Sequence, residues 1–373
     1  MNISKPDFLS NVRLNTFVQT LANQLELNAP LTFLNRTRVV TELDEAEILS
    51  SYSGSIFAAD LISDDAEAVI VESGRIETVG TISRVPNIKI GNRVGQGMLN
   101  ALNRLKRGIQ LDGPSDLITG WELNLAEVLV TGVRHRMNQL CAAMFLDGVT
   151  YDSKGFKINS GFGTPAELKQ TLLSTRQWTS GNVSTMLPIT DLQYMVQSVA
   201  PTYGKAYNRV TMATATFQLI TASDEFSERV RLLLRLDPGN FALSQYDVFN
   251  NQRLFEQVTG LTLELEDTTF RIRNNDGTST SSRVLPANKV ILSNSTDDNN
   301  PSAFKFANTI VDESIVAPLA NGAPNIGNGP LVGPVSYYWA NPSLNPPDLK
   351  AFAVAKGWPV KLDKYSTAII TVY

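Results

Sequence analysis

Residues 69–91 read VIVESGRIETVGTISRVPNIKIG, and this stretch decides the architecture that the sequence predicts. β-Branched residues recur throughout it, which is typical of extended strands. Neither alternate set of side chains is apolar along the whole length, and three glycines and Pro86 weaken a central strand. We therefore predict a long hairpin that projects outward, with its turn near Ser73-Gly74 or Val79-Gly80. Because an isolated two-stranded ribbon is marginal in water, we expect a neighbouring molecule to complete it.

The composition suits a protein of several domains that makes extensive contacts. The chain has 373 residues, enough for two or three domains with cores of their own. Its hydrophobic share of 43% is ordinary, whereas its charged share of 18% is low and suits a surface hidden in contacts. The net charge of −4 argues against a protein that neutralises nucleic acid, but it allows one that encloses DNA without gripping it.

The cysteine content and the length of the apolar segments indicate the cellular compartment in which the chain folds. Cys141 is the single cysteine, so an internal disulfide and a zinc site of several thiolates are excluded. It stands among apolar residues at helical spacing, and we interpret it as a buried structural thiol. We find no apolar segment suited to a signal peptide or a membrane span. We accordingly expect the chain to fold in a reducing cytoplasm and to have no membrane partner.

The strongest helical signal covers about residues 116–146, where apolar residues recur at steps of three and four. Asp116 and Glu122 lie near its start, and Arg134 and Arg136 lie in its second half, an order that suits the helix dipole. At about 1.5 Å per residue such a helix is about 45 Å long. We interpret it as an architectural element.

The remaining pattern predicts shorter elements of both kinds. The form of residues 190–193 is that of a helix-capping box, residues 214–222 are compatible with helix or strand, and residues 274–277 form a hairpin turn. We expect helices at 98–105, 165–175, 190–204 and 244–260, strands at 209–213, 261–266, 269–273, 283–293, 350–355 and 366–373 with Gly357-Trp358-Pro359 between the last two, and long loops over 294–348.

Side-chain chemistry gives no catalytic, metal or cofactor site. His135 is the only histidine, so a catalytic triad or a histidine-based metal site would depend on it alone, and we interpret it as a surface or interface residue. The GxSxG pattern and a Walker A loop are absent. Carboxylate clusters at 64–65, 264–267 and 297–298 lack calcium-loop spacing, and we interpret them as solvated loop charge. We predict no enzyme and no cofactor.

The order of parts resembles that of the major capsid proteins of tailed bacteriophages, which share the Hong Kong ninety-seven-type fold. Local sequence resembles the lambda-type branch, the capsid protein E family. Each motif is a packing or turn signal, and their order carries the resemblance. The similar pieces are Arg84-Val85-Pro86-Asn87-Ile88, residues 142–148, Trp178, Gly204, residues 208–212, residues 285–292, residues 345–349 and Pro359.

The resemblance implies an α+β fold with the parts of such a capsid protein. These parts are an N-terminal arm at 1–55, an extended β-ribbon loop at 56–97, a peripheral domain at 98–165 and 345–373 with the spine helix at about 116–146, and an axial domain at 166–344.

The resemblance also implies a shell protein of the virion, assembled in the host cytoplasm. Its subunits form hexamers and pentamers of an icosahedral head around double-stranded DNA, and the ribbon lies across the adjacent subunit. Ion pairs at such a contact are each worth roughly 0–1 kcal/mol, so repetition and apolar contacts matter more. The ribbon residues expected at inter-subunit contacts are Glu72, Arg75, Ile76, Glu77, Val79, Ile82, Arg84 and Arg93.

Further expectations concern partners. Lys89 is the one lysine of the ribbon and lies near its exit, which argues against autocatalytic crosslinking. The residues before the ribbon are too few for both an arm and a fused scaffold, so we expect a separate scaffolding protein, a portal and, as a further candidate, a decoration protein.

Three alternatives stay open. An encapsulin-like compartment differs in its contents, which are a protein cargo instead of DNA. A soluble α/β enzyme that uses a carboxylate pair is distinguished by a small oligomer with a closed pocket. Another head or tail protein, such as a tube subunit, forms tubes or rings instead of closed shells.

Overall fold

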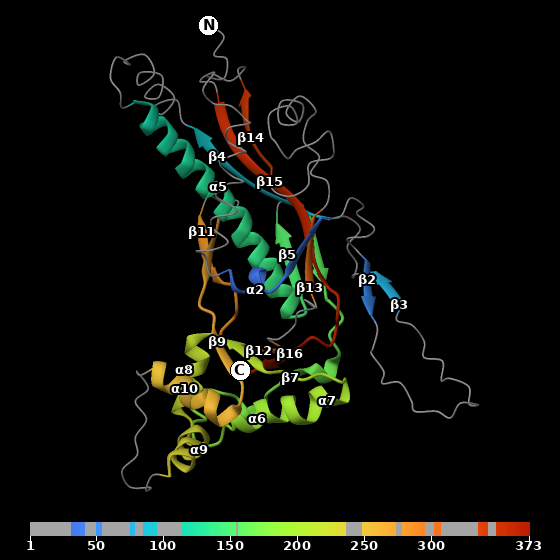
Figure 1. Ribbon diagram of the computed structural model, residues 1–373, viewed down its shortest axis with the longest axis vertical. Helices are drawn as coiled ribbons and strands as arrows, with labels where there is room; N and C mark the ends of the chain where they lie inside the picture. The colour runs from blue at the N-terminus through green and yellow to red at the C-terminus, as the bar shows by residue number, and fades with distance from the viewer. Residues whose placement is uncertain are drawn as a thin grey trace, which may run out of the picture. The chain divides into compact units, whose positions relative to one another are not determined.

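The chain folds into two compact units made of helices and separate sheets, which confirms the α+β prediction (Figure 1). Unit 1 takes its residues from 1–49, 83–140 and 304–359, and unit 2 from 50–82, 141–303 and 360–373. The sequence analysis places residues 345–373 in one domain. The structure assigns residues 345–359 to unit 1 and residues 360–373 to unit 2. The computed structural model describes residues 31–41, 50–53, 75–78, 85–94, 114–153, 156–235, 248–273, 278–294, 302–306, 335–341 and 348–373.

Helix α5 (Pro114–Phe145) confirms the long helix that the sequence predicts. It begins with proline, which fits a first helical position because that residue needs no hydrogen-bond donor. Its apolar residues at steps of four, from Leu125 to Cys141, are buried. Cys141 has no exposed surface, as predicted for a structural thiol.

Strand β15 (Asp348–Lys361) is central to the sheet of unit 1. It pairs antiparallel with β4 (Asn87–Val94) and with β14 (Val335–Asn341), and the sheet continues through β13 (Ser302–Phe306) to β1 (Arg38–Thr41). The expected loop over 294–348 therefore contains two strands, and the expected break at Gly357 is wrong. Strand β15 runs through Gly357 without a break. Glycine is required at this position because a Cβ atom would lie 2.6 Å from Phe304 and 2.9 Å from the Lys305 carbonyl oxygen.

Small residues let α5 pack closely on this sheet. Strand register places Ile88 opposite Ala355 and Ile90 opposite Ala353, and both alanines are buried. A Cβ atom on Gly132 of α5 would collide with the Ile90 side chain. The helix therefore lies against the face of β4 and β15 that carries these isoleucines and alanines.

An N-terminal segment is fixed to the same helix. In the short helix α2 (Thr32–Asn35), the backbone amides of Phe33 and Leu34 donate to Asn138 Oδ1 at 3.1 and 3.0 Å. Asn138 and Phe33 have no exposed surface. A buried amide oxygen with two backbone donors is satisfied, so this contact holds the segment in the core of unit 1.

The predicted hairpin within residues 69–91 is wrong. Strand β3 (Arg75–Thr78) pairs with β2 (Ser50–Ser53), and β4 pairs with β15, so the two halves of the stretch belong to different sheets. The reason is that Ile88 and Ile90 alternate on a face that α5 buries. Both proposed turn positions lie outside the described residues, as does the helix expected at 98–105.

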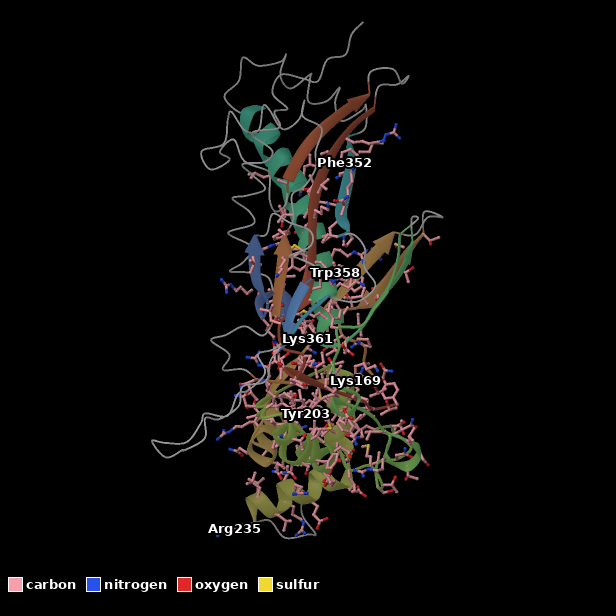
Figure 2. All side chains as sticks on the ribbon, turned by 90° about the vertical axis from the view of Figure 1, so that its right-hand side faces the viewer. Lys169, Tyr203, Arg235, Phe352, Trp358 and Lys361 are labelled. Atoms are coloured by element: carbon pink, nitrogen blue, oxygen red, sulfur yellow. The ribbon has the colours of Figure 1, made fainter. Side chains whose placement is uncertain are left out.

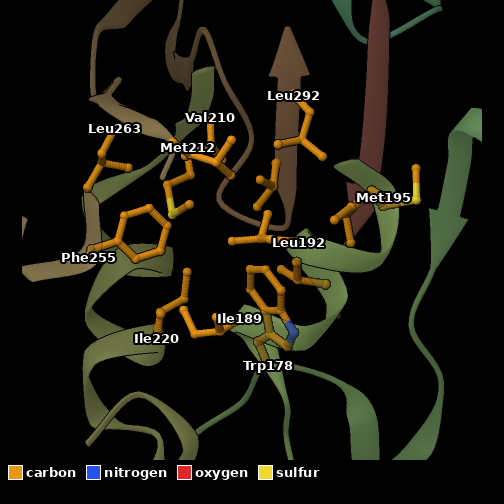
Figure 3. Close-up of a cluster of buried hydrophobic side chains, with 14 of the residues drawn as sticks. Trp178, Ile189, Leu192, Met195, Val210, Met212, Ile220, Phe255, Leu263 and Leu292 are labelled. Carbon is orange, nitrogen blue, oxygen red and sulfur yellow. The ribbon is translucent and has the colours of Figure 1, made fainter. Parts of the chain in front are cut away.

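Unit 2 surrounds a second sheet with helices. Its core gathers Trp178, Leu192, Met212 and Phe255 between the sheet and the helices (Figure 3). The strand order is β7 (Lys169–Thr171), β16 (Thr367–Thr371), β12 (Lys289–Ser293), β8 (Arg209–Met212) and β9 (Thr262–Leu265), and the α-helices are α6 (Pro188–Tyr194), α7 (Ala200–Thr202), α8 (Thr214–Ala222), α9 (Asp224–Leu234) and α10 (Val248–Thr259).

Several local expectations need correction. The helix predicted at 165–175 is instead a 3-10 turn followed by β7, because this segment pairs in parallel with β16. Helix α6 begins two residues before the expected capping box, and Asp191 accepts hydrogen bonds from Trp178 and Arg176. Besides the pair of β2 and β3, two hairpins belong to unit 2. One joins β10 (Thr269–Arg273) to β11 (Ser279–Arg283), whereas the sequence predicted residues 283–293 as the second strand. The other joins β5 (Val149–Ser153) to β6 (Phe156–Ser160) and was not predicted.

The close approach at β15 gives a stability test. Gly357→Ala should lower the free energy of unfolding by about 1–3 kcal/mol, because the added methyl group meets backbone that cannot move aside. Gly120→Ala is the matched control, since nothing lies within 4 Å of its Cβ position on α5 and alanine favours helix. Thermal and denaturant unfolding measure the stability of both variants. Equal stability of the two variants would contradict this packing.

Candidate inter-subunit surface

The carboxylate cluster at 264–267 is structural. Glu266 is buried and accepts a hydrogen bond from the Thr268 amide at 2.9 Å, which corrects its interpretation as solvated charge. Asp267 pairs with Arg283 at 2.7 Å and accepts from the Thr214 amide. The clusters at 64–65 and 297–298 lie outside the described residues.

Neither metal ligands nor membrane helices are found where the structure describes the chain. Within those ranges no three histidine, cysteine or carboxylate side chains are grouped so that they could hold a metal ion. Likewise, no described helix is both long and apolar enough to cross a membrane. His135 is half-buried, and burial lowers its pKa, so the imidazole is mainly neutral at pH 7.

A buried lysine organises unit 2 at the end of β15, where Figure 2 marks Lys361 and Lys169. The Lys361 ammonium donates to Thr164 Oγ1 and Thr367 Oγ1, both at 2.6 Å. Burial lowers its pKa to about 8, although the charges of Asp147 and Asp363 oppose this shift. No motif in the sequence distinguished this lysine from an exposed one.

Asp147 holds the chain just after α5. Its Oδ1 atom accepts from the backbone amides of Phe162 and Thr164 at 2.9 Å, and its Oδ2 atom pairs with Lys169 at 2.8 Å. Asp147 has a φ of 58°, a backbone angle that is uncommon for residues other than glycine but that aspartate tolerates. These contacts fix residues 147, 162, 164 and 169 to one another within unit 2.

The face of β4 that points away from α5 is exposed. Asn87, Lys89, Gly91 and Arg93 alternate with the isoleucines and all lie on this exposed face. Their partners on β15 are Lys356, Val354, Phe352 and Lys350, in that order.

The Phe352 ring, labelled in Figure 2, covers the position where Gly91 lacks a side chain. A Cβ atom on Gly91 would lie 2.5 Å from the ring, so the glycine is needed for this packing. The Lys89 ammonium lies 4.4 Å from the ring centroid, a cation–π distance. An aromatic ring and cations therefore share one solvent-facing sheet surface in unit 1.

The structure separates the ribbon residues that the sequence grouped at inter-subunit contacts. Arg75, Ile76 and Glu77 lie on β3, in unit 2, and Arg93 lies exposed on β4, in unit 1. The other four residues lie outside the described ranges: Glu72, Val79, Ile82 and Arg84. Sequence reasoning missed the partnership of Lys89 with Phe352, because their proximity depends on strand register across more than 250 residues.

One family model and several solved structures match the chain. A sequence model described as phage major capsid protein E matches residues 53–324, more than half of the chain. A prophage capsid protein from Escherichia coli CFT073 is 13% identical, with a TM-score of 0.58 over 98% of this chain and 99% of that one. At this identity the likeness shows the fold, and it confirms the predicted capsid fold. No curated protein sequence matches the chain.

Two further structures are similar over most of their length. A phage-related protein from Bordetella bronchiseptica RB50 is 11% identical, with a TM-score of 0.49 over 96% of this chain and 95% of that one. A chain of the satellite phage P4 procapsid is 10% identical, with a TM-score of 0.45 over 95% and 90%. Both TM-scores are below 0.5.

The buried lysine predicts a pH dependence of stability. Between about pH 8 and its ordinary pKa of 10.5, folded Lys361 is neutral while the unfolded chain still binds the proton. Stability therefore rises with pH in this window, by at most about 1.4 kcal/mol per pH unit. Below the window the burial of the charged lysine lowers stability by an amount that does not change with pH. Lys361→Met should remove that rise, measured by urea unfolding from pH 7 to 10. Identical slopes in both proteins would refute a buried, charged lysine.

Proposed function

Because this chain belongs to the phage major capsid protein E family, we propose that its copies form hexamers and pentamers of an icosahedral head that encloses the phage genome. A major capsid protein is a structural component of the virion and assembles with itself. The family match over residues 53–324 is the observation that carries this function, and the fold shared with a prophage capsid protein supports it.

We further propose that the two units serve as two of the capsid parts expected from the sequence. Unit 1, with α5 and the long strand β15, takes the place of the peripheral domain with its spine helix. Unit 2, with its helix-covered sheet, takes the place of the axial domain. The segment between β2 and β3 belongs to the extended loop that contacts the adjacent subunit, together with Arg75, Ile76 and Glu77 on β3.

The proposed head contains double-stranded DNA without sequence-specific binding. A net charge of −4 supports this, because a strongly basic protein binds DNA tightly and impedes its movement. The head has no catalytic function, and assembly takes place in the host cytoplasm with a separate scaffolding protein and a portal. Lys89 contacts an aromatic ring of its own chain, which supports the absence of a crosslink through this residue.

Removal of the loop segment tests the proposal. Residues 54–74 connect the two strands of an antiparallel pair, so a short Gly-Ser linker in their place leaves β2 and β3 able to pair. The wild-type chain, expressed with its scaffolding partner, should form closed shells in negative-stain micrographs. The shortened chain should keep its circular dichroism spectrum and form no shells.

Either of two results would contradict the proposal. Wild-type protein that remains a small oligomer under every condition would argue against a shell. Shells filled with a protein cargo, and not DNA, in infected cells would favour a compartment of the encapsulin type.

A further inference from the structure

The hairpin of β10 and β11 extends away from the sheet of unit 2 (Figure 1). Every residue of β11 is exposed, as are Thr269 and Arg271 of β10. At the base of the hairpin, the Val284 amide donates to the Thr268 carbonyl oxygen at 2.9 Å, and Val284 is buried. Because β11 buries none of its residues and an isolated two-stranded ribbon is marginal in water, the core of unit 2 does not account for this hairpin.

One face of the hairpin combines guanidinium and hydroxyl groups. Residues directly opposite each other in an antiparallel pair lie on the same face, and the next residue along each strand lies on the other face. Strand register therefore places three arginines and three hydroxyl residues on one face, with no carboxylate among them. We call these six residues the arginine face: Thr269, Arg271, Arg273, Ser279, Ser281 and Arg283.

The charge of Arg271 is available to a partner. Its side chain is exposed and makes no hydrogen bond or ion pair with the part of the chain that the structure describes. Arg283 differs, because it pairs with Asp267 at 2.7 Å, with 42% and 43% of the two side chains exposed. Phe270 lies on the opposite face and is partly buried, whereas the described side chains of the arginine face are all exposed. The arginine face therefore meets solvent.

Protection of a sheet edge accounts for only part of this composition. Among the described strands, β10 and β11 pair only with each other, and charges on such edge strands hinder pairing with other chains. Strand β11 is an edge as well, yet hydroxyl residues fill four of its five positions. Guanidinium and hydroxyl groups together are typical of phosphate contacts, because arginine donates in a bidentate fork and serine or threonine adds a further donor.

We propose that the arginine face contacts the phosphate backbone of the double-stranded DNA inside the shell. The inference rests on the proposed shell function and names a surface of the subunit that faces the genome. Because the whole chain has a net charge of −4, attraction to DNA is confined to a local surface of this kind. Contacts to phosphate carry no sequence information, which suits a shell that encloses DNA of any sequence. Arg271 and Arg273 give each copy a weak contact that does not immobilise the DNA.

Binding of the purified full chain to a short labelled DNA duplex, measured by fluorescence anisotropy, tests this contact. Arg271→Glu with Arg273→Glu should weaken binding at low salt about tenfold, because carboxylates then face phosphates. The slope of log K against log salt concentration should become shallower by about 2, since each phosphate contact contributes about 0.9. Arg271→Lys with Arg273→Lys keeps both charges and should keep most of the slope. Duplexes of different sequence should bind alike.

Matched controls separate this contact from net charge and from misfolding. Arg235→Glu with Arg253→Glu makes the same change of net charge at two exposed positions of unit 2 and should leave DNA binding unchanged. Circular dichroism and melting temperature report folding. If the reversal at Arg271 and Arg273 disturbs the fold, Arg271→Gln with Arg273→Gln replaces it and should also make the salt slope shallower.

In filled heads, ultraviolet light should crosslink DNA to the peptide that contains the hairpin. Adducts confined to other peptides would overturn the inference, as would equal affinity and slope of the wild type and the reversal variant, or no binding of the wild type at low salt. Loss of closed shells in the reversal variant with unchanged DNA binding would assign the arginine face to a contact between copies. All of these results leave the shell function standing, whereas failure of the wild type to assemble with its scaffolding partner refutes that function.

Discussion

The close packing of α5 on β4 and β15 is the constraint on which unit 1 depends. Gly132 on the helix and the alanines on β15 remove the side chains that would hold the two elements apart. Because one side of the sheet is thus filled by a helix, Lys89 and Arg93 of β4 lie on the other side, which is exposed. The same alternation of residues therefore produces both the buried face and the exposed face of β4.

Unit 2 combines an apolar core with buried polar groups that have specific partners. Asp191 joins Trp178 to the start of α6, and Lys361 joins two threonines from distant segments. Burial raises the pKa of Asp191 and lowers that of Lys361, so neither group favours folding through its charge. In any other fold of the unit these buried groups would lose their hydrogen-bond partners, which costs free energy, so the hydrogen bonds favour one arrangement of the chain.

Sequence patterns predicted the elements whose residues interact locally. Helix α5, strand β10 and the burial of Cys141 all follow from patterns along the chain. The pairing of residues 69–91 was predicted wrongly because the partners of β3 and β4 lie elsewhere in the sequence. The order of elements nevertheless indicated the family, since topology survives where single contacts cannot be derived.

The buried position of Cys141 has a practical consequence for chemistry on the particle. Its thiol lies on the buried face of α5 with no exposed surface. Because it is the single cysteine, a maleimide or a similar reagent has no native target in the folded protein. One cysteine introduced at an exposed position then becomes the sole accessible thiol of each subunit. A shell of such subunits displays a single attachment point per copy, in the regular geometry of the lattice.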